Sequence, residues 1–305
     1  MKHALDDLIN LFIQEKDVSK ISLVQYSFGL NKFYKWAVNE NKLLTGLTTA
    51  DMIKYKRYLS ELKYTHLTIS NYLGSVRLFY KWVELNEFGN DITKTLRINK
   101  NYSTFRKKSL NINQSVKFLK QFNTKTLMGK RNFAIANLLL RNGLREIEVS
   151  RMDVEDVFEY NDRWAIRLQR KGRSGKDDVL PLSEKAKEAI EDYLLHRNTD
   201  FQDSSPLFVS SSKANKYKRI STHFISVMIK QKLVQAGIVG KMFTAHSLRH
   251  TCATLLIADG HSEYSVKTFM GHRNFTSTQI YTRQKETEMI FNNSPAKLLD
   301  EMISN

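Results

Sequence analysis

Four short stretches in the second half of the chain hold side chains that could do chemistry. In chain order they carry Arg145 with Glu148, then Lys171, then His246 with Arg249, and last a Gly-His pair at 271–272 followed by Tyr281. Guanidinium groups stay charged and bind anionic oxygens through two parallel hydrogen bonds, so Arg145 and Arg249 suit a phosphoryl group. Tyr281 can act as a nucleophile once its proton is removed. Together these side chains suit attack on a phosphodiester, whose transition state carries extra negative charge on the nonbridging oxygens.

Taken singly, each stretch also has a purely structural interpretation. Arg145 and Glu148 are three residues apart and could form an ion pair, while Lys171 lies in a glycine-containing turn where lysines are usually solvated. His246 and His250 could share a metal ion, but no glutamate or third ligand completes a zinc pattern. A Gly-His pair is common where a helix ends. The functional interpretation therefore depends on the order and spacing of all four stretches.

That order and spacing resemble the tyrosine recombinase (phage integrase) family. The resemblance to the family's signature lies in Thr244–Thr251, Gly260, Met270-Gly271-His272 and Thr278–Thr282. The segment Gly143–Val149 is similar to the first arginine box of the family, and Arg170-Lys171-Gly172 with Val179–Leu182 is similar to its lysine hairpin. The match covers about residues 110–285, and no catalytic position departs from the pattern.

The resemblance implies a role for each residue. The catalytic set is Arg145, Lys171, His246, Arg249, His272 and the nucleophile Tyr281. Lys171 would protonate the departing 5′-oxygen, His246 would assist the proton movement, His272 would hydrogen-bond the phosphoryl oxygens, and Glu148 would orient the site. A covalent 3′-phosphotyrosine conserves the energy of the phosphodiester, so no cofactor, ATP or metal is expected.

Two acidic groups need a separate interpretation. Asp153, Glu155 and Asp156, and likewise Asp177 and Asp178, occupy adjacent or alternating positions of expected strands. Because neighbouring strand residues point to opposite faces, this is poor geometry for a two-metal site. We expect these carboxylates on a solvated surface.

The elements that position these residues follow from hydrophobic periodicity. Helices are predicted near residues 3–16, 22–39, 48–62, 68–87, 112–122, 127–142, 183–197, 220–236, 244–259, 263–270 and 286–302. Alternating patterns at Val154–Tyr160, Trp164–Gln169 and Asp178–Leu182 predict a three-stranded antiparallel meander, with residues 171–176 in its second turn. The fold class is therefore mainly α with a small antiparallel β-sheet. An N-terminal helical bundle, SAM-like and core-binding by resemblance, precedes an α+β catalytic domain.

We expect a core-binding domain at residues 1–97, a linker at 98–108, a catalytic domain at 109–285 and a tail helix at 286–305. The chain has 305 residues with 48 Lys+Arg against 31 Asp+Glu, a formal net charge of +17. A lysine-rich solvated surface or a nucleic-acid footprint would each give this excess, which spreads over both halves. In the first hundred residues the Tyr and Phe stripes are expected in the core. The candidate DNA-binding residues are Lys54, Lys56, Arg57, Arg77, Lys81, Arg106, Lys107, Lys108 and Arg173.

The predicted function is site-specific recombination of double-stranded DNA through a Holliday junction. The partners expected are two DNA duplexes and a homotetramer held by the tail, with an accessory protein or paralogous recombinase possible. One cysteine excludes an intramolecular disulfide, and no long apolar run is present, so we expect a cytoplasmic protein. A type IB topoisomerase and a non-catalytic DNA-binding protein are the alternatives, and an Xer-like recombinase or a mobile-element integrase are both compatible with the sequence.

Overall fold

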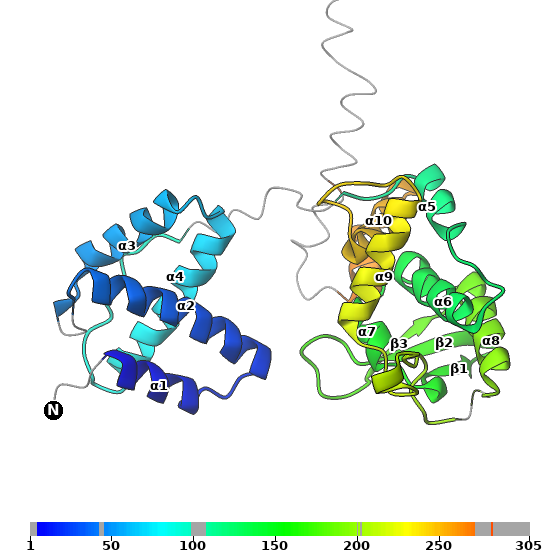
Figure 1. Cartoon of the computed structure of the whole chain (residues 1–305), viewed down its shortest axis with the longest axis horizontal. Coiled ribbons are helices and arrows are strands. Elements are labelled where there is room, and N and C mark those ends of the chain that lie inside the picture. Colours follow the sequence, from blue (N-terminus) through cyan, green and yellow to red (C-terminus); the bar gives the residue numbers. More distant parts are fainter. Residues whose placement is uncertain are drawn as a thin grey trace, which may run out of the picture. The chain divides into compact units, whose positions relative to one another are not determined.

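The computed structural model describes residues 5–42, 46–98, 108–199, 201, 203–271 and 282 (Figure 1). The chain divides into two compact units, Met1–Thr104 and Phe105–Asn305. Residues 99–107 of the predicted linker, with Arg106 and Lys107, lie outside the described residues, as do the predicted tail helix, His272 and Tyr281.

The described part of the first unit contains four α-helices, as predicted. They are α1 (Leu5–Glu15), α2 (Lys20–Asn39), α3 (Thr49–Glu61) and α4 (His66–Leu85). The start of α3 is fixed by a capping box: the Asp51 N–H donates to the Thr48 hydroxyl at 3.4 Å, and the Thr48 N–H donates to the Asp51 carboxylate at 2.9 Å. The aromatic stripes lie in the core, where Phe12, Phe33 and Phe79 are fully buried, so the core interpretation is confirmed.

In the second unit, helices pack against a small sheet (Figure 1). Its helices are α5 (Ile112–Leu119), α6 (Leu127–Arg141), α7 (Glu146–Arg151), α8 (Glu184–Arg197), α9 (Thr222–Gln235), α10 (Ala245–Ala258) and α11 (Glu263–Met270). Short 3₁₀ turns form at η2 (Val154–Asp156) and η3 (Lys213–Asn215). Helices α6 and α8 pack together, and Leu139 of α6 and Ile190 of α8 belong to one buried cluster with Ile166 of the sheet.

The sheet is the predicted antiparallel meander of β1 (Val157–Tyr160), β2 (Arg163–Leu168) and β3 (Asp178–Pro181), in that order. Asn161 and Asp162, both at positive φ, make the two-residue turn between β1 and β2. Residues 169–177 form the longer loop between β2 and β3, which we call the lysine loop because it contains Lys171. One expectation was wrong: residues 154–156 belong to η2 and not to β1. The Asp153 N–H donates to the Asp156 carboxylate at 2.7 Å, and this local turn replaces the strand.

Glu155 and Asp177 are exposed, as expected, whereas Asp156 is buried and Asp153 is half-buried, contrary to the expectation. Asp156 is 1% exposed, and Lys176 of the lysine loop forms ion pairs with Asp156 and, at 2.6 Å, with Asp153. Burial opposes the charge of Asp153, but hydrogen bonds from Lys176 and Arg219 outweigh it and lower the pKa of this carboxyl. Burial likewise opposes the charge of Lys176, but its hydrogen bonds to the two carboxylates raise the pKa of the ammonium group. Asp178 is also paired, with Arg170 and Arg173.

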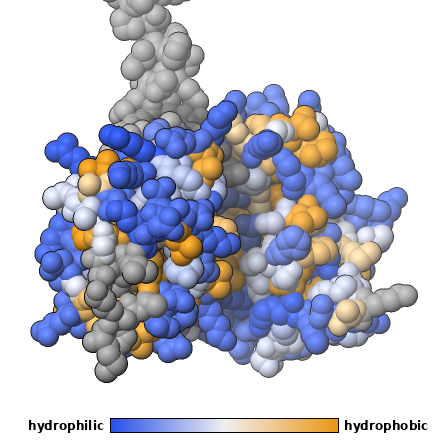
Figure 2. Space-filling view, turned by 60° about the vertical axis from the view of Figure 1, so that its left-hand side comes forward, coloured by the Kyte–Doolittle hydropathy of each residue, from blue (hydrophilic) through white to orange (hydrophobic). Residues whose placement is uncertain are grey.

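The face of the molecule in Figure 2 is mostly hydrophilic, with hydrophobic residues in separate patches. Within the described ranges, no helix has both the length and the apolar character needed to cross a membrane.

Candidate active site

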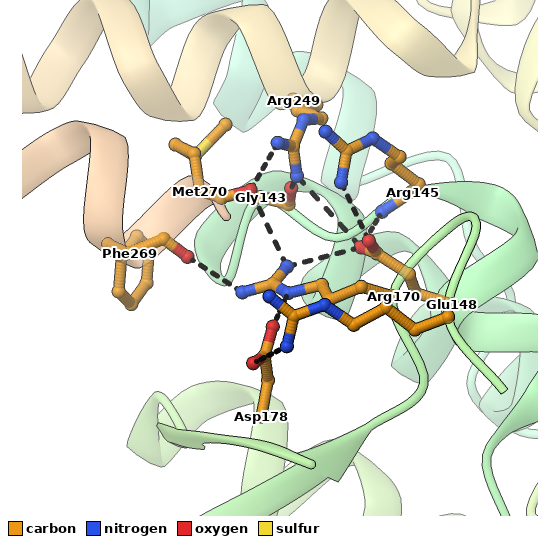
Figure 3. A network of polar contacts seen from close by, with 9 residues as sticks. Gly143, Arg145, Glu148, Arg170, Asp178, Arg249, Phe269 and Met270 are labelled. Carbon is orange, nitrogen blue, oxygen red and sulfur yellow. Dashed lines mark hydrogen bonds and ion pairs between the residues drawn. The ribbon is translucent and has the colours of Figure 1, made fainter. Parts of the chain in front are cut away.

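One buried carboxylate organises the arginines of the second unit. Glu148 is fully buried on α7, and the guanidinium groups of Arg145, Arg170 and Arg249 converge on it (Figure 3). The nitrogen–oxygen distances are 2.7 Å from Arg145, 3.4 Å from Arg170 and 3.9 Å from Arg249. Arg170 also pairs with Asp178, which binds Arg173 as well. Four guanidinium groups therefore face two carboxylates, and the excess of positive charge favours binding of an anion.

The N-terminus of α7 fixes the orientation of the Arg145 side chain. It is the N-cap residue of α7, and its backbone N–H donates to Glu148 Oε2 at 2.8 Å while its side chain donates to Oε1 at 2.7 Å. The same carboxylate therefore fixes the backbone and the side chain of Arg145. Its side chain is 24% exposed, against 2% for Arg249 and 6% for Arg170, so it is the most accessible of the three guanidinium groups.

Arg249 reaches the cluster from α10. Its guanidinium donates to the backbone carbonyls of Gly143, just after α6, and of Met270, at the end of α11. These bonds join three segments that lie far apart in the sequence. Arg249 is consequently held in one orientation beside Glu148.

Two glycines let the backbone approach this cluster. Gly143 has φ +60°, and a Cβ there would lie 2.7 Å from the Met270 sulfur. Gly271 has φ +59° and ends α11, and a Cβ there would lie 2.6 Å from Arg170 Cζ. Both positions combine a left-handed backbone with close packing, so glycine is needed at each.

Arg170 is the residue that the sequence analysis missed. It appeared there only as the neighbour of Lys171, with no role of its own. In the structure it is 5% exposed and contacts Glu148, Asp178 and the end of α11. The signal in the sequence was weak, because an arginine beside a lysine in a glycine-containing turn is usually solvated.

Lys171 and His246 lie at the surface, unlike the arginines. Lys171 is exposed at the start of the lysine loop, and His246 is exposed in the first turn of α10. The rings of His246 and His250 meet edge to face, with centroids 4.8 Å apart. Within the described ranges no cluster of three potential metal ligands occurs.

Cys252 of α10 lies in the same region but is not suited to nucleophilic attack. It is 5% exposed, and burial raises the pKa of its thiol to about 12, against a smaller opposing effect of Arg249. The thiol therefore stays protonated at neutral pH.

The candidate DNA-binding residues have varied surroundings. Arg57, Lys81 and Lys54 are exposed, although Lys54 lies 3.9 Å from Asp51. Lys56 donates to the Arg97 carbonyl at 2.9 Å, and Arg77 donates to the Leu96 carbonyl. Arg173 pairs with Asp178 at 2.9 Å, and the exposed Lys108 donates its backbone N–H to the Met242 carbonyl at 3.3 Å. Their contact with DNA stays a prediction.

The structure thus combines a helical unit with a second unit in which guanidinium groups gather on one buried carboxylate beside a small meander. The model of the phage integrase family matches residues 108–288, and that of the phage integrase N-terminal SAM-like domain matches residues 5–86. The chain belongs to the phage integrase family, the family of the tyrosine recombinases. The predicted family, fold class and type of enzyme are thereby confirmed.

The chain is similar to several Xer proteins. It is 33% identical to tyrosine recombinase XerC of Caldanaerobacter subterraneus subsp. tengcongensis over 162 residues, which is 52% of this chain but only 43% of that relative. It is 28% identical to tyrosine recombinase XerA of Pyrococcus furiosus over 297 residues, 96% of this chain and 93% of that relative. A crystal structure of the XerH site-specific recombinase, bound to a palindromic difH substrate after cleavage, has a TM-score of 0.77 at 18% identity and covers 96% of this chain and 85% of its own. These relatives give the topoisomerase alternative no support.

Proposed function

We propose that this protein is a site-specific recombinase that exchanges strands between two DNA duplexes through a covalent 3′-phosphotyrosine and a Holliday junction. The observation that carries the proposal is the convergence of Arg145 and Arg249 on the buried Glu148, at the end of α11. The chain then continues from α11 toward the segment with the predicted nucleophile. A DNA phosphate bound beside the end of α11 would contact the guanidinium groups of Arg145 and Arg249.

The proposed roles divide the reaction between the two ends of the scissile bond. Arg145 and Arg249 bind the nonbridging oxygens and stabilise the charge that develops there. Tyr281 attacks phosphorus while His246 accepts the phenolic proton, and the bond from phosphorus to the 5′-oxygen breaks as Lys171 donates a proton to that oxygen. His272 donates a hydrogen bond to the phosphoryl group. Resealing is the same step in reverse, with a 5′-hydroxyl as the nucleophile.

The two units are proposed to bind one duplex together, with residues 1–97 as a core-binding domain, 98–108 as the linker and 109–285 as the catalytic domain. Arg106, Lys107 and Lys108 would bind phosphates. Removing one such residue should reduce the slope of log affinity against log salt by about 0.9. Replacing all three residues by glutamine should therefore weaken binding and flatten the salt dependence without moving the cleavage position. A shifted cleavage position would contradict a purely electrostatic role.

Assembly into a tetramer is proposed to use the tail at 286–305. Deleting these residues should abolish formation of the synaptic complex, measured by gel shift and light scattering. Full assembly of the truncated protein would refute this role of the tail.

Covalent capture tests the function. Adducts mapped across host genomic DNA supply the target, and a nicked duplex carrying that target should trap a denaturant-resistant protein–DNA adduct. Tyr281→Phe should form none, and Arg145→Ala should form it much more slowly. Absence of an adduct with the wild-type protein would leave the non-catalytic DNA-binding alternative. An adduct accompanied by supercoil relaxation without strand exchange would favour the topoisomerase.

The same map separates the two biological roles. A single chromosomal site would favour an Xer-like role in resolving chromosome dimers. Adducts at the ends of an inserted element would favour a mobile-element integrase.

A further inference from the structure

Arg170 links the lysine loop to the rest of the site. Its Nε donates to Asp178 Oδ2 at 2.8 Å, across the two ends of the loop. Its Nη2 donates to the Phe269 carbonyl at 3.2 Å and its Nη1 to Glu148 Oε2 at 3.4 Å (Figure 3). One buried side chain thus connects β3, α7 and the end of α11.

The far end of the loop is also anchored. Lys176 forms ion pairs with Asp153 and Asp156 at η2. Residues 171–174, between the two anchors, are exposed. The loop therefore has a short exposed tip with fixed ends, and Lys171 is the first residue of that tip.

The contacts of Arg170 distinguish it from a third phosphate ligand. A guanidinium group has five N–H donors, and those of Arg170 face the carboxylates of Asp178 and Glu148 and the carbonyls of Phe269 and Met270. Its charge is neutralised locally by carboxylates that it shares with other residues. Arg145, by contrast, pairs with Glu148 and is partly exposed.

We propose that Arg170 is a positioning residue that acts through Lys171. By fixing the start of the lysine loop to Asp178 and to the end of α11, it holds the backbone of the next residue near the phosphate-binding arginines. Adjacent Cα atoms are about 3.8 Å apart, so an anchored Arg170 restricts where the Lys171 ammonium group can reach. This inference rests on the proposed function of Lys171 as the proton donor to the 5′-oxygen.

A substrate that needs no proton donor tests the proposal. In a 5′-bridging phosphorothiolate duplex the leaving atom is sulfur, and a thiol has a pKa of about 8.5 against about 15.7 for water, so the thiolate leaves without protonation. Loss of a general acid should slow cleavage of the ordinary duplex about 10²–10⁴-fold. The same loss should have little effect on the sulfur duplex.

Two variants disturb the anchor in different ways. Asp178→Asn removes the charge that joins the two ends of the loop but keeps Arg170 and its contacts with Glu148 and α11. Arg170→Lys keeps a positive charge but loses the planar fork. Each should cleave the ordinary duplex about 10–100-fold more slowly than the wild type and the sulfur duplex within about threefold of it, as expected for partial loss of general-acid catalysis.

Three further variants serve as references, all made in the full chain. Lys171→Ala should be rescued by sulfur, whereas Arg145→Ala should be slow on both duplexes. Asp177→Asn changes a neighbouring exposed carboxylate that has no ion pair among the described residues, and it should behave like the wild type. Thermal unfolding of each variant identifies any that fails to fold. If Arg170→Lys does not fold, the comparison of the two duplexes with Asp178→Asn tests the proposal.

The outcomes separate the positioning proposal from the proposed function. If Lys171→Ala is rescued by sulfur but Asp178→Asn and Arg170→Lys are equally slow on both duplexes, Arg170 does not act through Lys171. Wild-type rates for Asp178→Asn on the ordinary duplex would also overturn the proposal. If Lys171→Ala is not rescued, Lys171 is not the proton donor, and both statements fail.

Discussion

Replacing Glu148 with glutamine keeps the shape of the side chain and removes the only negative charge that faces Arg145, Arg170 and Arg249 together among the described residues. The fully buried carboxylate accepts from the side chain of Arg145 at 2.7 Å and from its backbone N–H at 2.8 Å. A glutamine amide retains one acceptor oxygen and turns an NH₂ group toward a donor. The three arginine charges then lack this counter-charge, and we expect the protein to lose stability.

The contacts set the size of the effect. Removing one partner of a buried ion pair costs about 3–5 kcal/mol, because the remaining charge is left uncompensated. Domains of this size lose about 2–4 °C of melting temperature per kcal/mol, so Glu148→Gln should lower the melting temperature by about 6–20 °C. Total stabilities are about 5–15 kcal/mol, so the variant should still fold at low temperature.

The assay compares two variants on the same helix, with and without an added anion. Glu146→Gln is the matched control, since Glu146 lies two residues earlier on α7, is half-buried and accepts from the Ser226 hydroxyl. Sulfate should raise the melting temperature of Glu148→Gln more than that of Glu146→Gln or the wild type, because the anion replaces the missing negative charge at the arginines. Sodium chloride at equal ionic strength controls for screening.

Two results would refute this reasoning. A melting temperature of Glu148→Gln within about 2 °C of Glu146→Gln would show that the carboxylate does not hold the arginines; this corresponds to less than about 1 kcal/mol. An equal response of both variants to sulfate would show that the anion does not replace the missing carboxylate charge at the arginines.

Two further predictions concern the surroundings of the site. Gly271→Ala and Gly260→Ala each place a Cβ at positive φ, which should cost about 1–2 kcal/mol of stability. Only the Cβ at position 271 would meet Arg170, 2.6 Å away, so urea unfolding should show about 1–3 kcal/mol more destabilisation for Gly271→Ala. Equal losses of stability in the two variants would contradict the close approach of Gly271 to Arg170. Lys176→Met should remove stability that depends on pH. The pKa of Lys176 is raised in the folded protein, so its contribution to stability is full below pH 10.5 and is lost as the pH rises through the pKa of the folded state. The pKa of Asp153 is lowered, so its contribution is full above pH 3.8 and is lost as the pH falls through the pKa of the folded state. The difference between wild type and variant in urea unfolding should therefore be constant from about pH 4 to 10 and shrink outside that range, whereas a difference that does not change with pH would rule out the ion pairs as its source.

Local patterns in the sequence were sufficient for most of the fold. The capping box at Thr48 and Asp51 and the alternation in β2 involve residues close together in the chain, so their physics is visible in a short window. Helix α7 has six residues and is too short to show a helical period, and it was not predicted as a helix. Residues 154–156 alternate apolar and polar side chains like a strand, but the Asp156 carboxylate accepts a hydrogen bond from the Asp153 N–H, and the segment forms the 3₁₀ turn η2 instead.

The site could be predicted only where residue types and spacing were specific. Arg145 and Glu148 are three residues apart, and their ion pair was one of the interpretations weighed. Arg170 was missed because the carbonyls it binds, those of Phe269 and Met270, lie about a hundred residues away, and backbone carbonyls leave no mark in a sequence. Asp156 was misplaced on the surface because its partner Lys176 is reached only through the folded loop.

The hydrogen bonds and ion pairs that join Arg145, Glu148, Arg170 and Arg249 are made by residues 143–270, and the two units have separate hydrophobic cores. The internal geometry of this arginine cluster therefore does not depend on contacts from the first unit. Under the proposed function, related proteins could therefore differ in the first unit, and so in the DNA sequence they bind, while the arginine cluster of the second unit stays the same. A chimera that joins residues 105–305 to the first unit of a relative would test whether the second unit keeps its cleavage activity when the first unit is exchanged.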